Sequence, residues 1–336
     1  MAGFEIGSAE ALPANGTAAE RVVVNEEVVV VDNAGARAVG VLGLGPMGLS
    51  LALRMREAGF DVVGTSRSAG TRARAAEQGI DVAATPRELA ARVRNGAGEA
   101  VPVLVVSLPA GPEVREALLG EDGALAAGGE FAVLDTSTCA HADSRALADD
   151  VRARGLAVVD APVSGGPTAA RAGTLSVMAG GADEDLAAVD DVLRAVAGQV
   201  VVCGGSGAGQ VAKACNQLVV TANIAAVAEA LVTASALGAD PAAVREALRG
   251  GYADSRVLDL HGDRMLRRDF SLGAAARTNL KDVDIIRELT EGVADNRVFE
   301  AAARVMQELV ETGGGDLDHS AAVQVVERRT GTSVDQ

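Results

Sequence analysis

The chain has 336 residues, of which 49% are apolar and only 2% are aromatic, so its core must be built mainly from alanine, valine and leucine. Its 46 acidic and 30 basic residues give a formal charge of −16, which disfavours nucleic acid or an anionic membrane surface as a partner. Three cysteines without CxxC spacing disfavour a disulfide framework or a cysteine-based zinc site, and three scattered histidines do not suggest a metal cluster.

Cysteine usage and the first residues also bear on location. A reducing cytoplasm is the simplest setting for these cysteines, and the first twenty residues hold three glutamates and no basic stretch typical of a signal peptide. We therefore expect a cytoplasmic protein. Residues 1–36 show no convincing helical periodicity, so we expect a disordered or loosely attached extension. A short hairpin in "VVVNEEVVVVD" (22–32) is the alternative.

From residue 37 to residue 199, strand-like and helix-like segments alternate. This alternation predicts a mainly parallel sheet covered on both faces, as in a Rossmann-type α/β domain. Two further short strands, in "TLSVMAGG" and "VVVCGG", surround a single helix near 184–197. The other expected strands cover 39–42, 61–65, 101–109, 131–137 and 155–160, and the other expected helices cover 47–57, 112–119 and 142–154.

Residues 200–330 have an almost entirely helical period and predict an all-α domain. Its first helix is expected to run unbroken from about residue 209 to residue 237. Asn223 and Glu229 interrupt the apolar run, so we interpret it as a buried helix and not as a membrane span. These helices are so apolar that one small domain cannot bury all of their apolar surface. We therefore expect a homodimer or homotetramer that assembles through this half of the chain.

The segment "GLGPMG" has G-x-G-x-x-G spacing between an expected strand and an expected helix. In such a turn the glycines allow a tight bend, bare backbone near a pyrophosphate and close helix–sheet contact, and the helix N-terminus favours the phosphates. The alternative is an ordinary tight turn. The context favours dinucleotide binding by Gly43, Leu44, Gly45, Pro46, Met47 and Gly48.

The residues at the end of the second strand indicate which of the two nicotinamide cofactors is bound. An NAD site normally has Asp or Glu there to bind the ribose hydroxyls. This chain has Ser66 and Arg67 instead. A hydroxyl and a guanidinium suit a 2′-phosphate, so NADP(H) is favoured over NAD(H). An ordinary surface arginine is the alternative.

Two further stretches indicate chemistry. In "DAPVSGG" (160–166) a strand ends in Ser164, Gly165 and Gly166, whose bare N–H groups suit a phosphate, a carboxylate or another piece of protein. In "GSGAGQVAKACNQ" (205–217), Lys213 and Asn216 lie with Gln217 on one helical face. Burying a lysine without a task costs free energy. The alternative is a surface-facing lysine whose stem lies along the helix.

The chain resembles the β-hydroxyacid dehydrogenase family, which includes relatives of 3-hydroxyisobutyrate and 6-phosphogluconate dehydrogenases. The resemblance covers about residues 38–329 and rests on "GLGPMG", "DTST", "DAPVSGG", "KACNQ", "NLKDV" and "GGGDLDHSA". The Asn-Gln pair at 216–217 and the "DHSA" ending are most similar to the branch that reduces tartronate semialdehyde to D-glycerate. Oxidation of 3-hydroxyisobutyrate or threonate is the alternative within the family.

The resemblance implies a role for each of several residues. Lys213 is implied as the general acid and base of hydride transfer, Ser164, Gly165 and Gly166 as the binding site of the substrate carboxylate, and Asn216 as a ligand of substrate oxygens.

The resemblance also implies that three more residues bind the cofactor. Ser137 and Thr138 are implied to lie near the nicotinamide, and Lys281 is implied to reach the cofactor from the helical domain. The simpler interpretations are that Ser137 caps a helix and that Lys281 pairs with Asp282 or Asp284.

Two other classes of function share the scaffold. Imine reductases usually lack the lysine at position 213 and the carboxylate loop, so Lys213 and Ser164 disfavour that activity. A non-catalytic scaffold that only binds the cofactor is expected to have lost the lysine, which is present here.

Overall fold

The computed structural model describes residues 21–24, 27–30, 37–97, 100–271 and 273–335. The chain forms two units, residues 1–36 and 37–336, and each is described by itself. In the first, β1 (Arg21–Val24) and β2 (Glu27–Val30) pair in antiparallel fashion. The hairpin that the sequence offered as an alternative is therefore formed. The predicted disorder of the rest of this extension lies outside the described residues.

A sheet of nine strands forms the centre of the described part of the second unit, in the order β11-β10-β8-β7-β6-β3-β4-β5, with β9 paired to β10. The six strands from β8 to β5 in this order are parallel, while β10 runs antiparallel to β8 and β9. This confirms the mainly parallel sheet. The strands are β3 (Ala38–Leu42), β4 (Asp61–Thr65), β5 (Asp81–Ala83), β6 (Val103–Val106), β7 (Ala132–Asp135), β8 (Ala157–Asp160), β9 (Val163–Ser164), β10 (Leu175–Gly180) and β11 (Ala197–Gly204).

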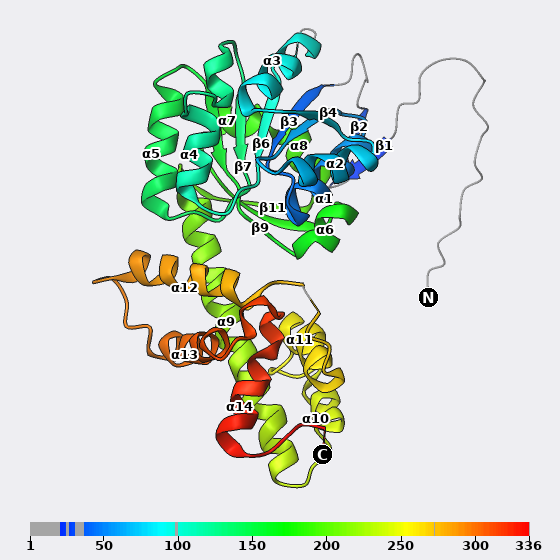
Figure 1. Ribbon diagram of the computed structural model, residues 1–336, viewed down its shortest axis with the longest axis vertical. Helices are drawn as coiled ribbons and strands as arrows, with labels where there is room; N and C mark the ends of the chain where they lie inside the picture. Colours follow the sequence, from blue (N-terminus) through cyan, green and yellow to red (C-terminus); the bar gives the residue numbers. More distant parts are fainter. Residues whose placement is uncertain (1–20, 25–26, 31–36, 98–99, 272, 336) are drawn as a thin grey trace, which may run out of the picture. The chain divides into compact units, whose positions relative to one another are not determined.

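Helices cover both faces of this sheet (Figure 1). Because β3, β6 and β7 are buried on both faces, their sequences are nearly continuous apolar runs and do not alternate. One apolar core lies between the sheet and α1 (Pro46–Glu57), α2 (Ala69–Glu77), α6 (Gly166–Ala172) and α8 (Asp190–Val196). The other lies between the sheet and α3 (Pro86–Gly96), α4 (Gly111–Leu119) and α5 (His141–Arg152), with η1 (Ala124–Ala127) beside it.

One expected helix of this half was wrong. The segment near 184–197 contains two helices, α7 (Asp183–Ala187) and α8, with a break at Ala188 and Val189. Val189 is fully buried and has a non-helical backbone, so packing of its side chain interrupts the helical period. The next strand, β11, already begins at Ala197 and runs across the predicted division at residue 199.

The C-terminal region is helical and is built around α9 (Ala208–Ala236), within one residue of the expected span. By length and composition α9 could cross a membrane, but it contacts all five later helices and buries Ile224, Leu231 and Val232 among them, so it is a core helix. Its neighbours in Figure 1 are α10 (Pro241–Leu248), α11 (Arg256–Arg267), α12 (Ala276–Thr290), α13 (Arg297–Glu311) and α14 (Ala322–Thr330), with η2 (Gly314–Asp316) and η3 (His319–Ala321) between the last two.

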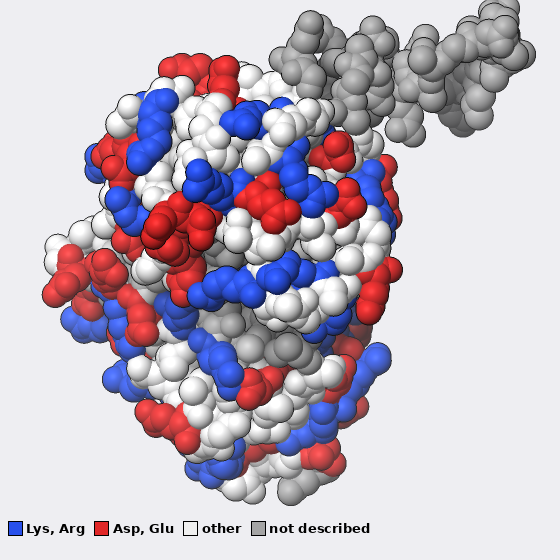
Figure 2. All heavy atoms as spheres, turned by 45° about the horizontal axis from the view of Figure 1, so that its top comes forward, with Lys and Arg blue, Asp and Glu red and all other residues white. Residues whose placement is uncertain are grey.

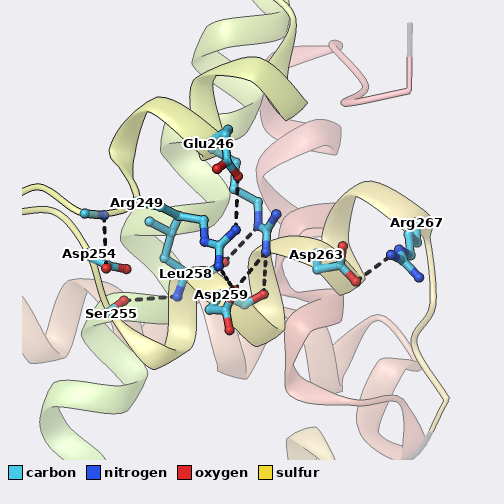
Figure 3. Close-up of polar contacts among 10 residues, drawn as sticks. Glu246, Arg249, Asp254, Ser255, Leu258, Asp259, Asp263 and Arg267 are labelled. Carbon is cyan, nitrogen blue, oxygen red and sulfur yellow. Dashed lines mark hydrogen bonds and ion pairs between the residues drawn. The ribbon is translucent and has the colours of Figure 1, made fainter.

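Charged side chains on the surface pair locally. At the corner between α10 and α11, Arg249 contacts both Glu246 and Asp259, and the hydroxyl of Ser255 accepts a hydrogen bond from Leu258 N (Figure 3). Such exposed pairs are each worth little, about 0–1 kcal/mol, and they serve mainly to fix the corner. Figure 2 shows acidic and basic side chains interspersed on the face that it presents.

The start of α9 is fixed to the sheet by one buried carboxylate. Asp160, the last residue of β8, accepts hydrogen bonds from Gly207 N at 2.6 Å and from Gln210 N at 3.2 Å. A Cβ on Gly209 would overlap the carbonyl oxygen of Met178, so only glycine lets the helix approach β10 this closely. The helix therefore leaves the sheet at a point set by these donors.

We expect Asp160→Asn to lower the free energy of unfolding by about 1–3 kcal/mol, because the two N–H donors bind different carboxylate oxygens and the amide would set an NH2 group against one of them. Urea denaturation followed by circular dichroism measures this change. The control is Asp150→Asn, which removes an exposed ion pair with Arg115 and should change stability by less than about 0.5 kcal/mol. Equal effects of the two substitutions would contradict the anchoring role.

Candidate active site

The glycine-rich turn between β3 and α1 has one open position between two closely packed ones. Gly43 has a φ of +104°, and a Cβ there would overlap the carbonyl oxygen of Ser107. A Cβ on Gly48 would overlap the carbonyl oxygen of Gly43, whereas nothing lies within 4 Å of a Cβ on Gly45. No acidic residue occupies the first turn of α1 and no side chain caps it, so its N-terminal N–H groups suit the pyrophosphate of a dinucleotide.

The remaining residues of the turn differ in how they could take part. Pro46 is exposed at the first helical position, beside the open side of Gly45. The side chains of Leu44 and Met47 pack into the apolar core beneath. They can therefore contribute main-chain atoms or shape, but not a free side chain.

At the end of β4 the structure places Ser66 half-buried and Arg67 exposed. The guanidinium of Arg67 donates no hydrogen bond to the residues that the structure describes. Arg72, which the sequence reasoning missed, donates to the carbonyl oxygens of both Ser66 and Arg67. Because no helix was predicted over residues 69–77, the predicted elements did not point to this contact. Arg72 therefore holds the loop in place, and Arg67 is exposed on it.

The loop after β7 is held inside the molecule. Ser137 is buried, its hydroxyl accepts a hydrogen bond from Leu108 N at 3.0 Å, and its own N–H donates to Asp135 at 3.0 Å. Because α5 begins at His141 with Ala140 as its cap, Ser137 does not cap that helix. Burial raises the pKa of Asp135 to about 6.

The Ser-Gly-Gly loop follows β8. Ser164 lies on β9, and the next two residues have φ values of +131° at Gly165 and +72° at Gly166, which favour glycine. A Cβ on Gly165 would press against Ala169, while nothing lies within 4 Å of a Cβ on Gly166. Within the described residues no hydrogen bond joins this loop to α9. The loop is therefore open at Gly166 and packed against α6 at Gly165.

Lys213 is buried on α9 and belongs to a partly buried hydrogen-bond network. Its Nζ donates to Gln217 Oε1 at 3.0 Å, Asn216 Nδ2 donates to the same oxygen at 2.8 Å, and Gln217 Nε2 donates to Asp282 Oδ2 at 2.6 Å. Burial lowers the pKa of Lys213 to about 8, against the attraction of Asp282 and together with the repulsion of Lys281. The lysine therefore does not face solvent on the surface.

Lys281 joins α12 to two loops of the α/β half. Its Nζ donates to the carbonyl oxygens of Pro109 at 2.7 Å and Thr138 at 2.9 Å. It also lies 3.5 Å from Asp282 Oδ1, so the simpler pairing that the sequence suggested is present as well. The structure thus brings Lys281 and Thr138 together.

Two glutamines that the site prediction left out connect these parts. Gln210 Nε2 donates to the carbonyl oxygen of Ser137 at 2.9 Å, and its Oε1 accepts from Cys139 N at 3.0 Å. Gln210 and Gln217 lie one turn before and one turn after Lys213, so helical spacing was the signal for both. Asp282 on α12 lies in the motif "NLKDV", but its contact with Gln217 was not predicted.

Two of the three histidines lie side by side although they are 58 residues apart in the sequence. His261 and His319 approach to 3.1 Å between their Nε2 atoms, and His261 lies 3.5 Å from Asp318. Both oxygens of Asp318 already accept hydrogen bonds from Ser320 or from the N–H groups of residues 273 and 274, and Arg264 lies 3.1 Å away. A fully used carboxylate beside a guanidinium is a poor cation ligand. Burial lowers the pKa of His319 to about 4, so this histidine is neutral.

Two family models match nearly the whole second unit. One, described as the NAD binding domain of 6-phosphogluconate dehydrogenase, matches residues 38–205. The other, described as NAD-binding of NADP-dependent 3-hydroxyisobutyrate dehydrogenase, matches residues 207–326. The matches meet just before α9 begins.

Individual proteins resemble this chain over most of its length. The 2-hydroxy-3-oxopropionate reductase of Escherichia coli (strain K12) is 37% identical over 294 residues, which are 86% of this chain and 97% of that protein. L-threonate dehydrogenase of Cupriavidus necator is 31% identical over 293 residues, which are 86% and 96% of the two chains. The crystal structure of 3-hydroxyisobutyrate dehydrogenase from Salmonella typhimurium has a TM-score of 0.76 at 27% identity, covering 86% of this chain and 99% of that one.

Proposed function

The chain belongs to the β-hydroxyacid dehydrogenase family of NAD(P)-dependent oxidoreductases, and we propose that it interconverts tartronate semialdehyde and D-glycerate. The observation that carries this proposal is the buried Lys213 in its network with Asn216 and Gln217. The identity to 2-hydroxy-3-oxopropionate reductase over most of both chains supports this substrate pair.

We assign the chemistry to this chain's own residues as follows. When bound, the nicotinamide supplies or accepts the hydride. In reduction, protonated Lys213 donates its proton to the oxygen of the aldehyde, and in oxidation neutral Lys213 accepts it. A pKa near 8 leaves both forms accessible around neutral pH. The Ser164 hydroxyl and the N–H groups of Gly165 and Gly166 bind the carboxylate, and Asn216 binds a substrate oxygen.

We further propose that residues 37–199 bind the dinucleotide and residues 200–330 complete the substrate site. Ser66 and the exposed Arg67 support NADP(H) over NAD(H), and Ser137, Thr138 and Lys281 are assigned to its nicotinamide end. A cytoplasmic location fits the described cysteines, none of which is paired in a disulfide.

A second candidate is the oxidation of 3-hydroxyisobutyrate or L-threonate. The similarity to L-threonate dehydrogenase over almost the same span favours keeping it. A panel of these acids and their aldehydes with both cofactors separates the candidates, because turnover of one acid in large excess over the others identifies the substrate.

Lys213→Met is expected to lower kcat by about 10²–10⁴-fold, because the site loses its proton donor while a side chain of similar length remains. Stopped-flow kinetics measures kcat. In the variant, binding of NADPH, followed by fluorescence, and the melting temperature should stay close to the wild-type values; undiminished turnover would refute the assignment of Lys213.

In the wild type, the rate of reduction should fall as pH rises through about 8, where Lys213 loses its proton, and the rate of oxidation should rise there. Stopped-flow kinetics at a series of pH values measures both rates.

For Arg67→Ala we expect the ratio of kcat/KM with NADP to kcat/KM with NAD to fall about tenfold or more, because a charge-assisted contact to the 2′-phosphate is lost. Steady-state assays with the two cofactors give this ratio. Arg328→Ala, on α14, is the control and should leave it unchanged. A wild-type enzyme that strongly prefers NAD would overturn the assignment of Ser66 and Arg67.

We also propose assembly into a homodimer or homotetramer through the helical half. The exposed positions of α9 follow one side of the helix and include Val219, which is 53% exposed. Val219→Glu should shift the protein to monomer in sedimentation velocity runs at micromolar concentration, since the interface would bury a carboxylate. Val298→Glu, at an exposed valine of α13, is the matched control. A wild-type chain that sediments only as monomer would refute assembly.

A further inference from the structure

The buried carboxylate of Asp282 fixes the orientation of an amide that the proposed mechanism does not use. Asp282 is 6% exposed, and when ionised it only accepts hydrogen bonds. Gln217 Nε2 lies 2.6 Å from its Oδ2. Turning the amide over would set the carbonyl oxygen of Gln217 against the carboxylate. Gln217 must therefore present its nitrogen to α12 and its oxygen to the opposite side.

That oxygen is fully used within α9. Gln217 Oε1 accepts from Lys213 Nζ at 3.0 Å and from Asn216 Nδ2 at 2.8 Å, which fills both of its lone pairs. The bond to Lys213 favours the ammonium form against the effect of burial. The charged groups that face this ammonium from the neighbouring helix are Asp282, which favours the charged form, and Lys281, which opposes it.

The same arrangement sets what Asn216 offers to a ligand. Its nitrogen is held by Gln217, so its carbonyl oxygen points away from that bond. Among the described residues no donor binds Asn216 Oδ1. A half-buried free acceptor matches a ligand that carries a hydroxyl, and it is left unpaired by a ligand that carries a methyl group in the same place.

We propose that Gln217, held by Asp282, is a positioning residue that keeps Lys213 protonated and turns the carbonyl oxygen of Asn216 toward the substrate. The enzyme then prefers semialdehydes with a hydroxyl, and not a methyl group, on the carbon next to the reacting aldehyde. This inference rests on the proposed function, because it concerns the same lysine and the same substrate class.

The experiment compares the wild type with Gln217→Met, Gln217→Glu and Gln210→Met. Reductive kcat/KM is measured from pH 6 to pH 10 with 2-hydroxy-3-oxopropionate and with its 2-methyl analogue. The pKa of Lys213 is also measured without turnover, from the pH dependence of its labelling by an amine-reactive reagent, read by mass spectrometry on the protein without cofactor.

The two substitutions at position 217 should act in opposite directions. Gln217→Met removes the acceptor, so the alkaline limb of the profile should move down by about half a pH unit or more, and the preference for the hydroxylated substrate should fall about 3- to 10-fold. Gln217→Glu sets a second carboxyl group against Asp282, in place of the amide nitrogen that now donates to it, so the two carboxyl groups must share one proton. Part of the negative charge then lies on the carboxyl group at 217, beside the ammonium, and this group still accepts from Asn216. Its alkaline limb should therefore move up while the preference stays near the wild-type value.

Gln210→Met is the matched control, because it loses two hydrogen bonds on the same helix without contacting Lys213. It should slow turnover but leave the alkaline limb and the preference unchanged. Wild-type values for Gln217→Met, or shifts of the same sign for both variants at 217, would overturn the inference. If the wild type reduces neither aldehyde, the proposed function fails, and the labelling pKa still decides whether Gln217 sets the protonation of Lys213.

Discussion

The arrangement of the site depends on how one helix starts. Asp160 ends a central strand and accepts hydrogen bonds from the first N–H groups of α9, whose next turn carries Lys213. A carboxylate at a helix N-terminus satisfies donors that the helix cannot pair itself and interacts favourably with its dipole. Burial nonetheless raises the pKa of Asp160, so the N–H groups only partly offset the lost hydration. The hydrogen bonds to Asp160 therefore fix the position of Lys213 relative to the sheet.

A second constraint is that the lysine and the carboxylate of the site do not contact each other directly. Lys213 and Asp282 are both nearly buried, yet they are separated by the amide of Gln217 and do not form a direct ion pair. A direct pair would hold the lysine as a permanent cation, since an adjacent carboxylate strongly favours the ammonium. An intervening amide weakens that attraction while still orienting the ammonium. Burial can then lower the lysine pKa into the range where a proton is easily given and taken.

The sequence predicted the features that depend on local spacing. The strand Asp61–Thr65 and the long helix α9 are found almost as expected, because turn residues and periodicity are local signals. Helical spacing also put Lys213, Asn216 and Gln217 on one face. The two helices and one strand between residues 69 and 96 were not predicted, since short amphipathic segments give weak periodicity.

What the sequence could not supply was pairing between distant segments. Gln217 and Asp282 are 65 residues apart, and the histidine pair joins residues 58 apart, so no spacing rule relates them. The glycines illustrate the same limit. Their G-x-G-x-x-G pattern indicated a turn, but only the packing shows that Gly45 is open while Gly43 and Gly48 are closed by backbone.

The continuity of α9 has a mechanical consequence. Beyond its first turn the helix contains neither glycine nor proline, so its 29 residues form a stiff rod about 43 Å long. Residue 213 lies within two turns of the anchored end of this rod, and the same rod contacts all five later helices, so one continuous backbone holds the lysine against both the sheet and the helical region.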